Sequence, residues 1–368
     1  MGDRSDILLV GQTPPPYHGQ AVVTAMLFDH RWEDLRVELL RMAYSDSIGA
    51  VGKVSLGKVF HLLGLVLKTW KIALLRRPAI LYYLPASANR APVARDVIYL
   101  ALVRWCFRKK IFHYHAGGLP EYVESAGWLG ALARRVYRGA DLSIEICPTE
   151  HSPGESFAAK RTVIVPNGLD VTRLPRQRPA GVPRALFIGS LSEGKGVLEL
   201  IRTAGVLRRR GCAIQFQVVG GWSSPEFEAE VEALVQSERV GEMVNFTGVL
   251  AGDAKWQQYA DADFFFFPSH YGAENFPLVL IEALAYGLPI VSTRWRGIPQ
   301  LVGDRGAATL CEVKSPDQFA DALEALCADE GGVRGRMATA AVETYLGRFT
   351  EEKFVEAMAR CFRELRDA

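Results

Sequence analysis

Short apolar runs alternate with longer amphipathic segments along the first half of the chain. Turn-forming or polar residues bound the runs, and several of the segments between them are long enough for helices. This alternation is typical of βαβ units around a parallel sheet, whose strands are buried on both faces. The strands predicted in this half are residues 6–11, 79–84, 110–115, 142–146 and 162–167.

A proline- and arginine-rich stretch, residues 170–184, interrupts this alternation and predicts a linker. Beyond it we predict strands at 185–190, 214–221, 243–248, 263–269 and 288–293. We therefore expect an α/β protein of two Rossmann-like, doubly wound domains, residues 1–170 and 183–349. A last helix at about 350–368 could pack on either domain, including back on the first. Two such domains facing each other would leave a central cleft at the carboxyl ends of their strands, where such sheets bind ligands.

Composition narrows the class of protein. The 368 residues are 49% hydrophobic and 23% charged, with a net charge of +2, which argues against a dedicated nucleic-acid binder. The six cysteines are scattered without a CxxC pair, so we expect reduced thiols and no zinc site. Charged residues near the N-terminus leave no signal peptide, and no apolar segment reaches membrane-spanning length. These features predict a cytoplasmic protein.

The first candidate for phosphate binding is the stretch FIGSLSEGKGVLEL at 187–200. A predicted strand ends at Gly189, a loop with Ser190 follows, and a helix begins near Gly196, just after Lys195. Backbone N–H groups at the positive end of a helix bind anions, and Lys195 adds a cation there. The alternative is an ordinary turn with a solvated lysine, because the GxxxxGK[ST] spacing of a P-loop is absent.

The second candidate is the stretch GAENFPLVLIEALAYG at 272–287. Phe276-Pro277 suits a helix start, which would leave the N–H of Leu278 open to a phosphate or sugar oxygen. Glu274 then falls in the loop before the helix and Glu282 within it, so they need not form a catalytic pair. Carboxylates recognise vicinal hydroxyls well. Singly, each acid has a simpler explanation, as a helix N-terminal acid or a surface or salt-bridged glutamate.

Two further loops follow predicted strands of the first half. His115 lies at the end of the strand at 110–115, where a histidine could hydrogen-bond a ligand or transfer a proton. His113 is also open to a structural role, since its side chain should face away from that of Tyr114. No ligand cluster supports a metal there. Gly19, in a proline-rich loop after the first strand, could allow close backbone approach to a ligand, although the prolines also suit a stiff turn.

Taken together, these motifs resemble the retaining GT-B glycosyltransferases numbered family four, the glycosyl transferases group 1. The likeness covers most of the chain in the family's order. It includes HYHAGG, VPNGLD at 165–170, GSLSEGKG at 189–196, and FFPSHYGAENFPLVLIEALAYGLPIVST at 266–293. The spacing of Glu274 and Glu282 in an E-x7-E motif, followed by Ala-x-Gly-x-Pro, is its most specific element.

The resemblance implies roles for individual residues. Glu274 would contact hydroxyls of the transferred sugar, Glu282 the ribose of the nucleotide, and Lys195 the donor diphosphate. His115 would lie near the reacting centre and Gly19 near the phosphates. The implied catalytic residues are His115, Glu274 and Lys195. The implied donor-binding residues are Gly19, Gly189, Ser190, Lys195, Glu274, Asn275, Phe276, Pro277, Leu278 and Glu282.

The chain also departs from the family's pattern. Ser190 stands where many members have an arginine that shares the diphosphate, and Arg294 or Arg296 could compensate. Gln300 replaces a frequent glutamate, and His18-Gly19 replaces a glycine pair.

The resemblance implies transfer of a hexose from a UDP- or GDP-sugar, with retention, to a saccharide or lipid-linked acceptor in cell-surface polysaccharide or glycolipid synthesis. We identify no DxD motif of the kind that holds a divalent ion in metal-dependent transferases, so we expect neither a metal nor another cofactor. The alternatives are a GT-B-like nucleotide-sugar epimerase or hydrolase, which needs no acceptor, and a non-catalytic nucleotide-sugar binding protein.

Two segments of the first half are basic, apolar and free of acids, residues 53–77 and 104–110. They could form a cationic amphipathic surface on the inner face of an anionic membrane. The alternative is a helix that packs its Leu/Val face on the sheet and exposes its lysines; one helix can do both.

Overall fold

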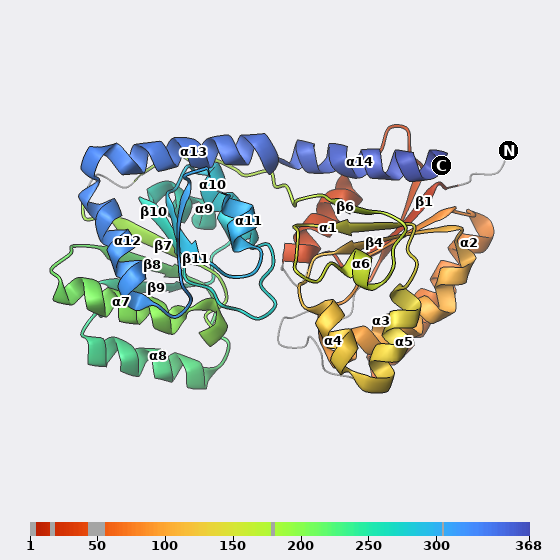
Figure 1. The fold of residues 1–368 in the computed structure, drawn as a ribbon, viewed down its shortest axis with the longest axis horizontal. Helices are drawn as coiled ribbons and strands as arrows, with labels where there is room; N and C mark the ends of the chain where they lie inside the picture. The colour runs from red at the N-terminus through yellow and green to blue at the C-terminus, as the bar shows by residue number, and fades with distance from the viewer. Residues whose placement is uncertain (1–4, 15–18, 43–55, 178–180, 304) are drawn as a thin grey trace. The chain divides into compact units, whose positions relative to one another are not determined.

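The computed structural model describes the chain except residues 1–4, 15–18, 43–55, 178–180 and 304, and the side chains of 56–59 and 330. Two compact units make up the chain (Figure 1). Residues 1–168 together with 352–368 form unit 1, and residues 169–351 form unit 2. The last helix of the chain thus belongs to the unit formed by the N-terminal half.

The sheet of unit 1 has six parallel strands in the order β2-β1-β3-β4-β5-β6. Strands β1 and β3 are wholly buried, as expected for a parallel sheet covered on both faces. The strands are β1 (Ile7–Gly11), β2 (Val37–Arg41), β3 (Ile80–Tyr83), β4 (Lys109–Tyr114), β5 (Leu142–Glu145) and β6 (Thr162–Ile164).

Helices cover both faces of this sheet. Residues from α2, α3, α4 and α5 share one core with Leu8, Leu81 and Phe112, whereas α14 packs on the other face, where Phe362 lies 5.5 Å from the Tyr82 ring. None of the helices in the described ranges is both long and apolar enough to cross a membrane. The helices are α1 (Gly19–Asp29), α2 (Leu56–Leu75), α3 (Arg90–Val103), η2 (Arg104–Cys106), α4 (Leu119–Ser125), α5 (Gly127–Tyr137), α6 (Pro153–Ser156) and α14 (Glu351–Asp367).

The sheet of unit 2 also has six parallel strands, in the order β12-β11-β10-β7-β8-β9. Its strands are β7 (Arg184–Ile188), β8 (Gln215–Val219), β9 (Val244–Gly248), β10 (Phe264–Phe267), β11 (Ile290–Thr293) and β12 (Ala308–Cys311). Its helices are η3 (Glu193–Lys195), α7 (Val197–Arg209), α8 (Pro225–Glu238), α9 (Gly252–Asp261), α10 (Leu278–Ala285), α11 (Ile298–Val302), α12 (Pro316–Ala328), η4 (Glu330–Gly332) and α13 (Val333–Arg348).

The predicted α/β class and the two doubly wound sheets are confirmed, and each of the ten predicted strands is present. Two strands were not predicted, β2 and β12. Both lie at the edge of their sheets, where side chains remain partly exposed and the apolar run that marks a buried strand is interrupted.

Candidate functional site

Strand order in unit 2 locates a site before any side chain is considered. From β7 the chain builds outward through β8 and β9, and from β10 it builds the other way through β11 and β12. The loops that leave β7 and β10 therefore diverge at a topological switch point, the place where open α/β sheets bind ligands. These two loops, residues 189–196 and 268–277, contain seven of the ten donor-binding residues implied by the resemblance, including Lys195 and Glu274.

Gly196 allows the two loops to approach closely. Its φ of +79° lies in the left-handed region, and a Cβ there would overlap the backbone carbonyl oxygen of Pro268. The backbone N–H of His270 also donates to the Gly194 carbonyl oxygen at 2.8 Å. The loop after β7 is thus fixed to the loop after β10.

Lys195 and Glu274 meet across these loops. The Lys195 Nζ lies 2.5 Å from Glu274 Oε2, and the Ser269 hydroxyl donates to the same oxygen at 2.9 Å. The ammonium also lies 5.1 Å from the centroid of the Tyr271 ring and 5.5 Å from that of Phe267, within cation–π range. The carboxylate is buried and the ammonium largely so, which makes the pair a polarised, mostly dehydrated site.

The prediction that Glu274 precedes the helix and Glu282 lies within it is confirmed. Pro277 is the N-cap residue of α10, which begins at Leu278. As a first-turn residue, Leu278 has no intrahelical partner for its N–H, so that end of the helix can accept an anion. The preceding residues Asn275 and Phe276 are buried.

Glu282 belongs to a different cluster. Its Oε1 lies 2.5 Å from Lys255 Nζ, and its Oε2 accepts a hydrogen bond from the Tyr259 hydroxyl at 2.6 Å. Burial and the adjacent Glu282 carboxylate raise the pKa of Tyr259 well above its usual value, which keeps this hydroxyl a donor. Glu282 is therefore salt-bridged and buried, and none of these contacts is shared with Glu274.

Lys255, Tyr259 and Ser269 were missed by sequence reasoning. Lys255 and Tyr259 lie four residues apart on one face of α9, and this spacing was the available signal. Nothing along the chain indicates which glutamate they contact.

Gly19 and His115 lie in unit 1. Gly19 is the first residue of α1, in the connection after β1, and β1 and β3 flank the switch point of that sheet. His115 is buried beyond the end of β4, with its ring centroid 4.1 Å from that of His113. Neither residue belongs to the unit that contains Lys195 and Glu274.

His113 has a structural environment. Its Nδ1 lies 2.6 Å from the Tyr82 hydroxyl, and its ring faces Phe354 of α14, on the opposite side of the sheet from Tyr114 as predicted. Complete burial, and then the neighbouring His115, lower the pKa of His113 well below its usual value.

Of the residues at which the chain departs from the family pattern, Ser190 lies in the loop after β7. Ser190 is exposed, whereas Arg294 lies 3.8 Å from a carboxylate oxygen of Glu312. Arg296 stacks on Trp295, 5.6 Å from its ring centroid, and the Trp295 indole donates to the Tyr271 carbonyl oxygen at 2.8 Å. Arg296 thus adjoins the loop after β10. His18 lies outside the described residues.

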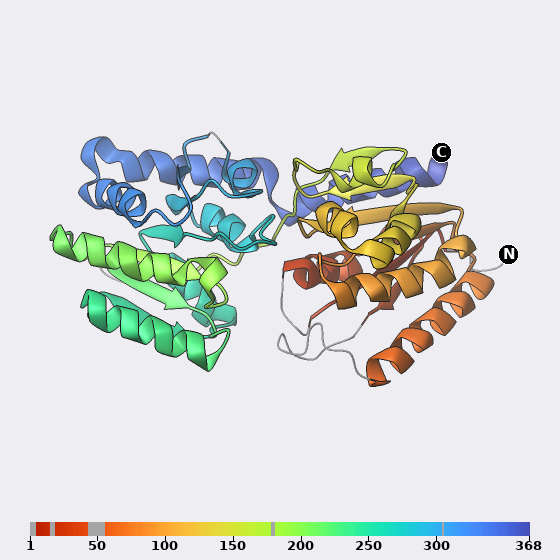
Figure 2. The same ribbon diagram turned by 60° about the horizontal axis from the view of Figure 1, so that its bottom comes forward.

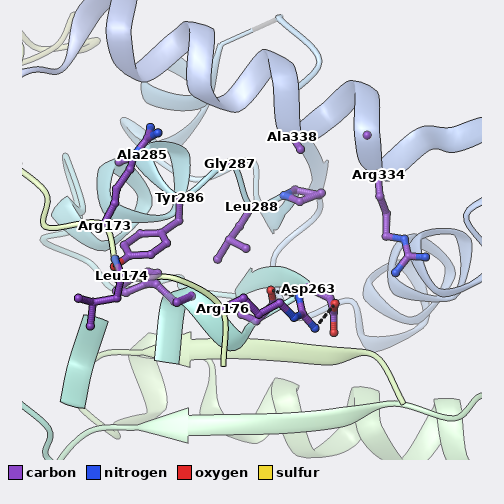
Figure 3. Close-up of a pocket in the computed structure, with 15 residues that line it drawn as sticks. Arg173, Leu174, Arg176, Asp263, Ala285, Tyr286, Gly287, Leu288, Arg334 and Ala338 are labelled. Carbon is purple, nitrogen blue, oxygen red and sulfur yellow. Dashed lines mark hydrogen bonds and ion pairs between the residues drawn. The ribbon is translucent and has the colours of Figure 1, made fainter. Parts of the chain in front are cut away.

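A cavity of about 520 Å³ lies elsewhere in unit 2, at the amino ends of β10 and β11 (Figure 3). It is lined by side chains such as Arg173, Tyr286 and Arg334, and an ion pair of 2.9 Å joins Arg176 to Asp263 beside it. None of the predicted site residues lines it. This agrees with the rule that ligands of such sheets bind at the opposite, carboxyl edge. In the part of the chain that the structure describes, no group of three His, Cys, Asp or Glu side chains could hold a metal ion.

Comparison with known proteins finds a family match within the second unit. Residues 173–344 match the family described as "Glycosyl transferases group 1". The putative colanic acid biosynthesis glycosyltransferase WcaL of Escherichia coli K12 is 31% identical over 159 residues, 41% of this chain and 37% of WcaL. The amylovoran biosynthesis glycosyltransferase AmsK of Erwinia amylovora is 24% identical over 66% of this chain and 63% of its own length. The matched parts thus span less than two thirds of either relative.

Solved structures show the same fold over nearly the whole chain. Sucrose-phosphate synthase from Thermosynechococcus elongatus superposes with a TM-score of 0.73 at 18% identity, over 98% of this chain and 99% of that one. HepE of Anabaena, solved in complex with UDP, gives a TM-score of 0.70 at 17% identity, over 98% and 100%. The predicted GT-B fold class is confirmed, and residues 173–344, within the second unit, match the glycosyl transferases group 1.

Proposed function

We propose that the protein is a retaining glycosyltransferase that moves a hexose from a nucleotide-diphosphate sugar to a saccharide or lipid-linked acceptor. The observation that carries this proposal is the contact of Lys195 with Glu274 at the switch point between β7 and β10. A cation for phosphate and a carboxylate for hydroxyls lie side by side there. A sugar joined to a diphosphate presents both an anion and hydroxyls in one ligand.

In this proposal the donor replaces the contacts that the two side chains make with each other. The diphosphate accepts hydrogen bonds from Lys195 and from the first-turn N–H groups of α10, while Glu274 accepts them from the sugar hydroxyls. Glu282 accepts hydrogen bonds from the ribose, with Lys255 and Tyr259 holding its carboxylate in place. The complexes of HepE with UDP and with UDP-glucose support a uridine nucleotide as the first donor to test.

The sugar-transfer step then depends on how well the departing diphosphate is stabilised. The acceptor oxygen bonds to the anomeric carbon, the bond from that carbon to the β-phosphate oxygen breaks, and the acceptor proton passes to the departing diphosphate. Attack and departure on one face of the sugar retain its configuration. Lys195 and the helix amides stabilise the charge that develops on the diphosphate. The resemblance also implies a catalytic role for His115, and in this proposal the reaction proceeds without a metal or other cofactor.

The names of the relatives support a biological role. WcaL and AmsK are named for colanic acid and amylovoran biosynthesis, so we propose cell-surface polysaccharide or glycolipid assembly as the process. An acceptor on a lipid carrier would place the enzyme in the cytoplasm, at the inner face of the membrane, where we expect the basic, apolar segments 53–77 and 104–110 to dock. Residues 53–55 of the first segment lie outside the described residues.

A thermal-shift screen against UDP- and GDP-sugars tests the donor, since a ligand that binds the folded state alone raises Tm by mass action. Lys195→Gln should abolish the shift given by the cognate donor. Donor consumption is then compared with and without saccharide or lipid-linked acceptors. Consumption that requires an acceptor supports transfer, whereas equal consumption without one indicates a hydrolase or epimerase, and a Tm shift without consumption indicates a binding protein. Equal rates with and without EDTA would support metal independence.

A further inference from the structure

Helix α2 exposes a stripe of large apolar side chains. Phe60, Leu63, Leu67, Trp70 and Leu74 recur every three or four residues, so they lie on one face of the helix. Their exposed fractions range from 38% for Trp70 to 71% for Phe60 and Leu74. The opposite face, with Leu62, Leu65 and Val66, is buried in the core of unit 1. The helix thus has apolar residues on both faces, whereas a helix with one face in water normally has charged or polar residues on that face.

Trp105 extends this stripe beyond α2. It is 70% exposed, and its ring centroid lies 6.5 Å from that of Trp70, whose indole N–H donates to the Leu102 carbonyl oxygen at 3.0 Å. Figure 2 shows α2 and α3 side by side, so the residues that follow α3 lie next to the stripe. We call Phe60, Leu63, Leu67, Trp70, Leu74 and Trp105 the apolar face.

Cations without partner carboxylates adjoin the apolar face. Lys68, Lys71, Arg77 and Arg108 are exposed and form no ion pair with another described residue. Residues 56–110 contain eleven lysines and arginines and one acid, Asp96. Asp96 is wholly buried and bonded to Tyr83, Tyr137 and Arg95, so it leaves the surface potential positive.

We propose that the apolar face docks unit 1 on a bilayer containing anionic lipids. Its aromatic and leucine side chains enter the boundary between headgroups and acyl chains, and the four cations contact lipid phosphates. A second copy of the chain is a poorer occupant, because two such faces would bring uncompensated cations together. The inference deepens the proposed function, on which it rests for the lipid-linked acceptor, but docking itself requires no sugar transfer.

The test is flotation of the full chain with phosphatidylcholine vesicles and with vesicles containing about one third phosphatidylglycerol. We expect binding to the anionic vesicles that weakens as salt is raised. At about 1 kcal/mol per cation, the double variant Lys68→Gln/Lys71→Gln should bind about 30-fold more weakly. Trp105→Ala and Leu67→Ser should also weaken binding. Trp128→Ala is the matched control, since Trp128 of α5 is 69% exposed in the same unit and lies outside the apolar face.

Wild-type protein that stays in the soluble fraction with both kinds of vesicle would overturn the inference. So would an equal loss of binding in Trp128→Ala and Trp105→Ala. A third contrary result would be a dimer in solution, without vesicle binding, that the Trp105 and Leu67 substitutions dissociate. The outcomes separate from those of the proposed function. If the protein glycosylates a soluble acceptor but does not bind vesicles, only the docking inference is disproved. If the protein floats with vesicles but consumes no donor, only the proposed transfer activity is disproved.

Discussion

At the scale of single residues, Lys195 and Glu274 stabilise each other in a place where neither would be stable alone. Both side chains are largely withdrawn from water, and Ser269 supplies a further hydrogen bond to the carboxylate. Removing one partner leaves the other charge uncompensated, which costs folding free energy as well as ligand binding. Each variant of this site therefore needs a stability measurement beside its kinetics.

We predict that Lys195→Gln lowers kcat/KM for the donor by about 100- to 1,000-fold, the usual loss when a preorganised donor to developing negative charge is removed. Lys160→Gln is the control, because it removes a lysine 2.7 Å from Asp141 in unit 1, away from the switch point. Steady-state kinetics with urea unfolding of each variant provide the measurement. A kcat/KM within about twofold of wild type in a folded Lys195→Gln protein would disprove the assignment.

Glu282→Gln should act mainly on donor binding. Loss of a charge-assisted hydrogen bond of about 1.5–3 kcal/mol would raise KM about 10- to 100-fold with little change in kcat, because the ribose is remote from the reacting bond. The variant also removes the charge that faces Lys255, so Tm without ligand is measured in parallel. An unchanged KM accompanied by a lower Tm would make Glu282 a structural residue.

At the scale of elements, buried strands and helix starts could be predicted, whereas partial exposure and distant contacts could not. Local sequence is enough to predict β10, a run of four phenylalanines, and the start of α10 at Pro277. Strand β2 does not, because its exposed positions break the apolar run. The contact of Lys255 with Glu282 joins residues 27 positions apart on different helices, and only the packing of those helices brings them together.

Gly196 offers a test of the loop geometry. Gly196→Ala should lower the free energy of unfolding by about 1 kcal/mol for the left-handed backbone, and by a further 1–3 kcal/mol, roughly, for overlap with the Pro268 carbonyl. Gly211→Ala, also at positive φ but in open space, should show only the first cost. Because the overlap displaces the loop that carries Lys195, only the Gly196 variant should also lose activity. Equal destabilisation of the two variants would contradict the close approach.

At the scale of the whole molecule, unit 1 is completed by the far end of the chain. Phe354 and Phe362 of α14 cover the side of the sheet that holds Tyr82 and His113, and Arg363 lies 2.8 Å from Asp34. Unit 1 therefore acquires one side of its core only after the rest of the chain has been made. The stability of that core depends on a histidine that burial keeps neutral.

We predict that the free energy of unfolding decreases at acidic pH because His113 is buried in its neutral form. Its pKa is lowered in the folded state by burial, so as pH falls below about 6.5 the unfolded chain takes up the proton first and gains stability. The His113 contribution is present above that pH and is lost at up to about 1.4 kcal/mol per pH unit below it. His113→Phe should flatten the pH dependence of unfolding between pH 7.5 and 5.5, measured in urea. His151→Gln, at an exposed position of the same unit, should leave it unchanged, and parallel profiles for wild type and His113→Phe would refute this role.

The ion pair at the switch point also bears on which anions the site excludes. A bare phosphate that approached Lys195 would meet the Glu274 carboxylate 2.5 Å from the ammonium, and it offers that carboxylate no hydroxyl in return. On the proposed function, only a ligand with both an anionic and a hydroxyl-bearing part satisfies both side chains, so inorganic phosphate and pyrophosphate should compete weakly with the donor. In that proposal the sugar hydroxyls leave with the acceptor after transfer, and Lys195 then returns from the nucleotide to Glu274. On the proposed function, the same contact would therefore select the donor and favour product release.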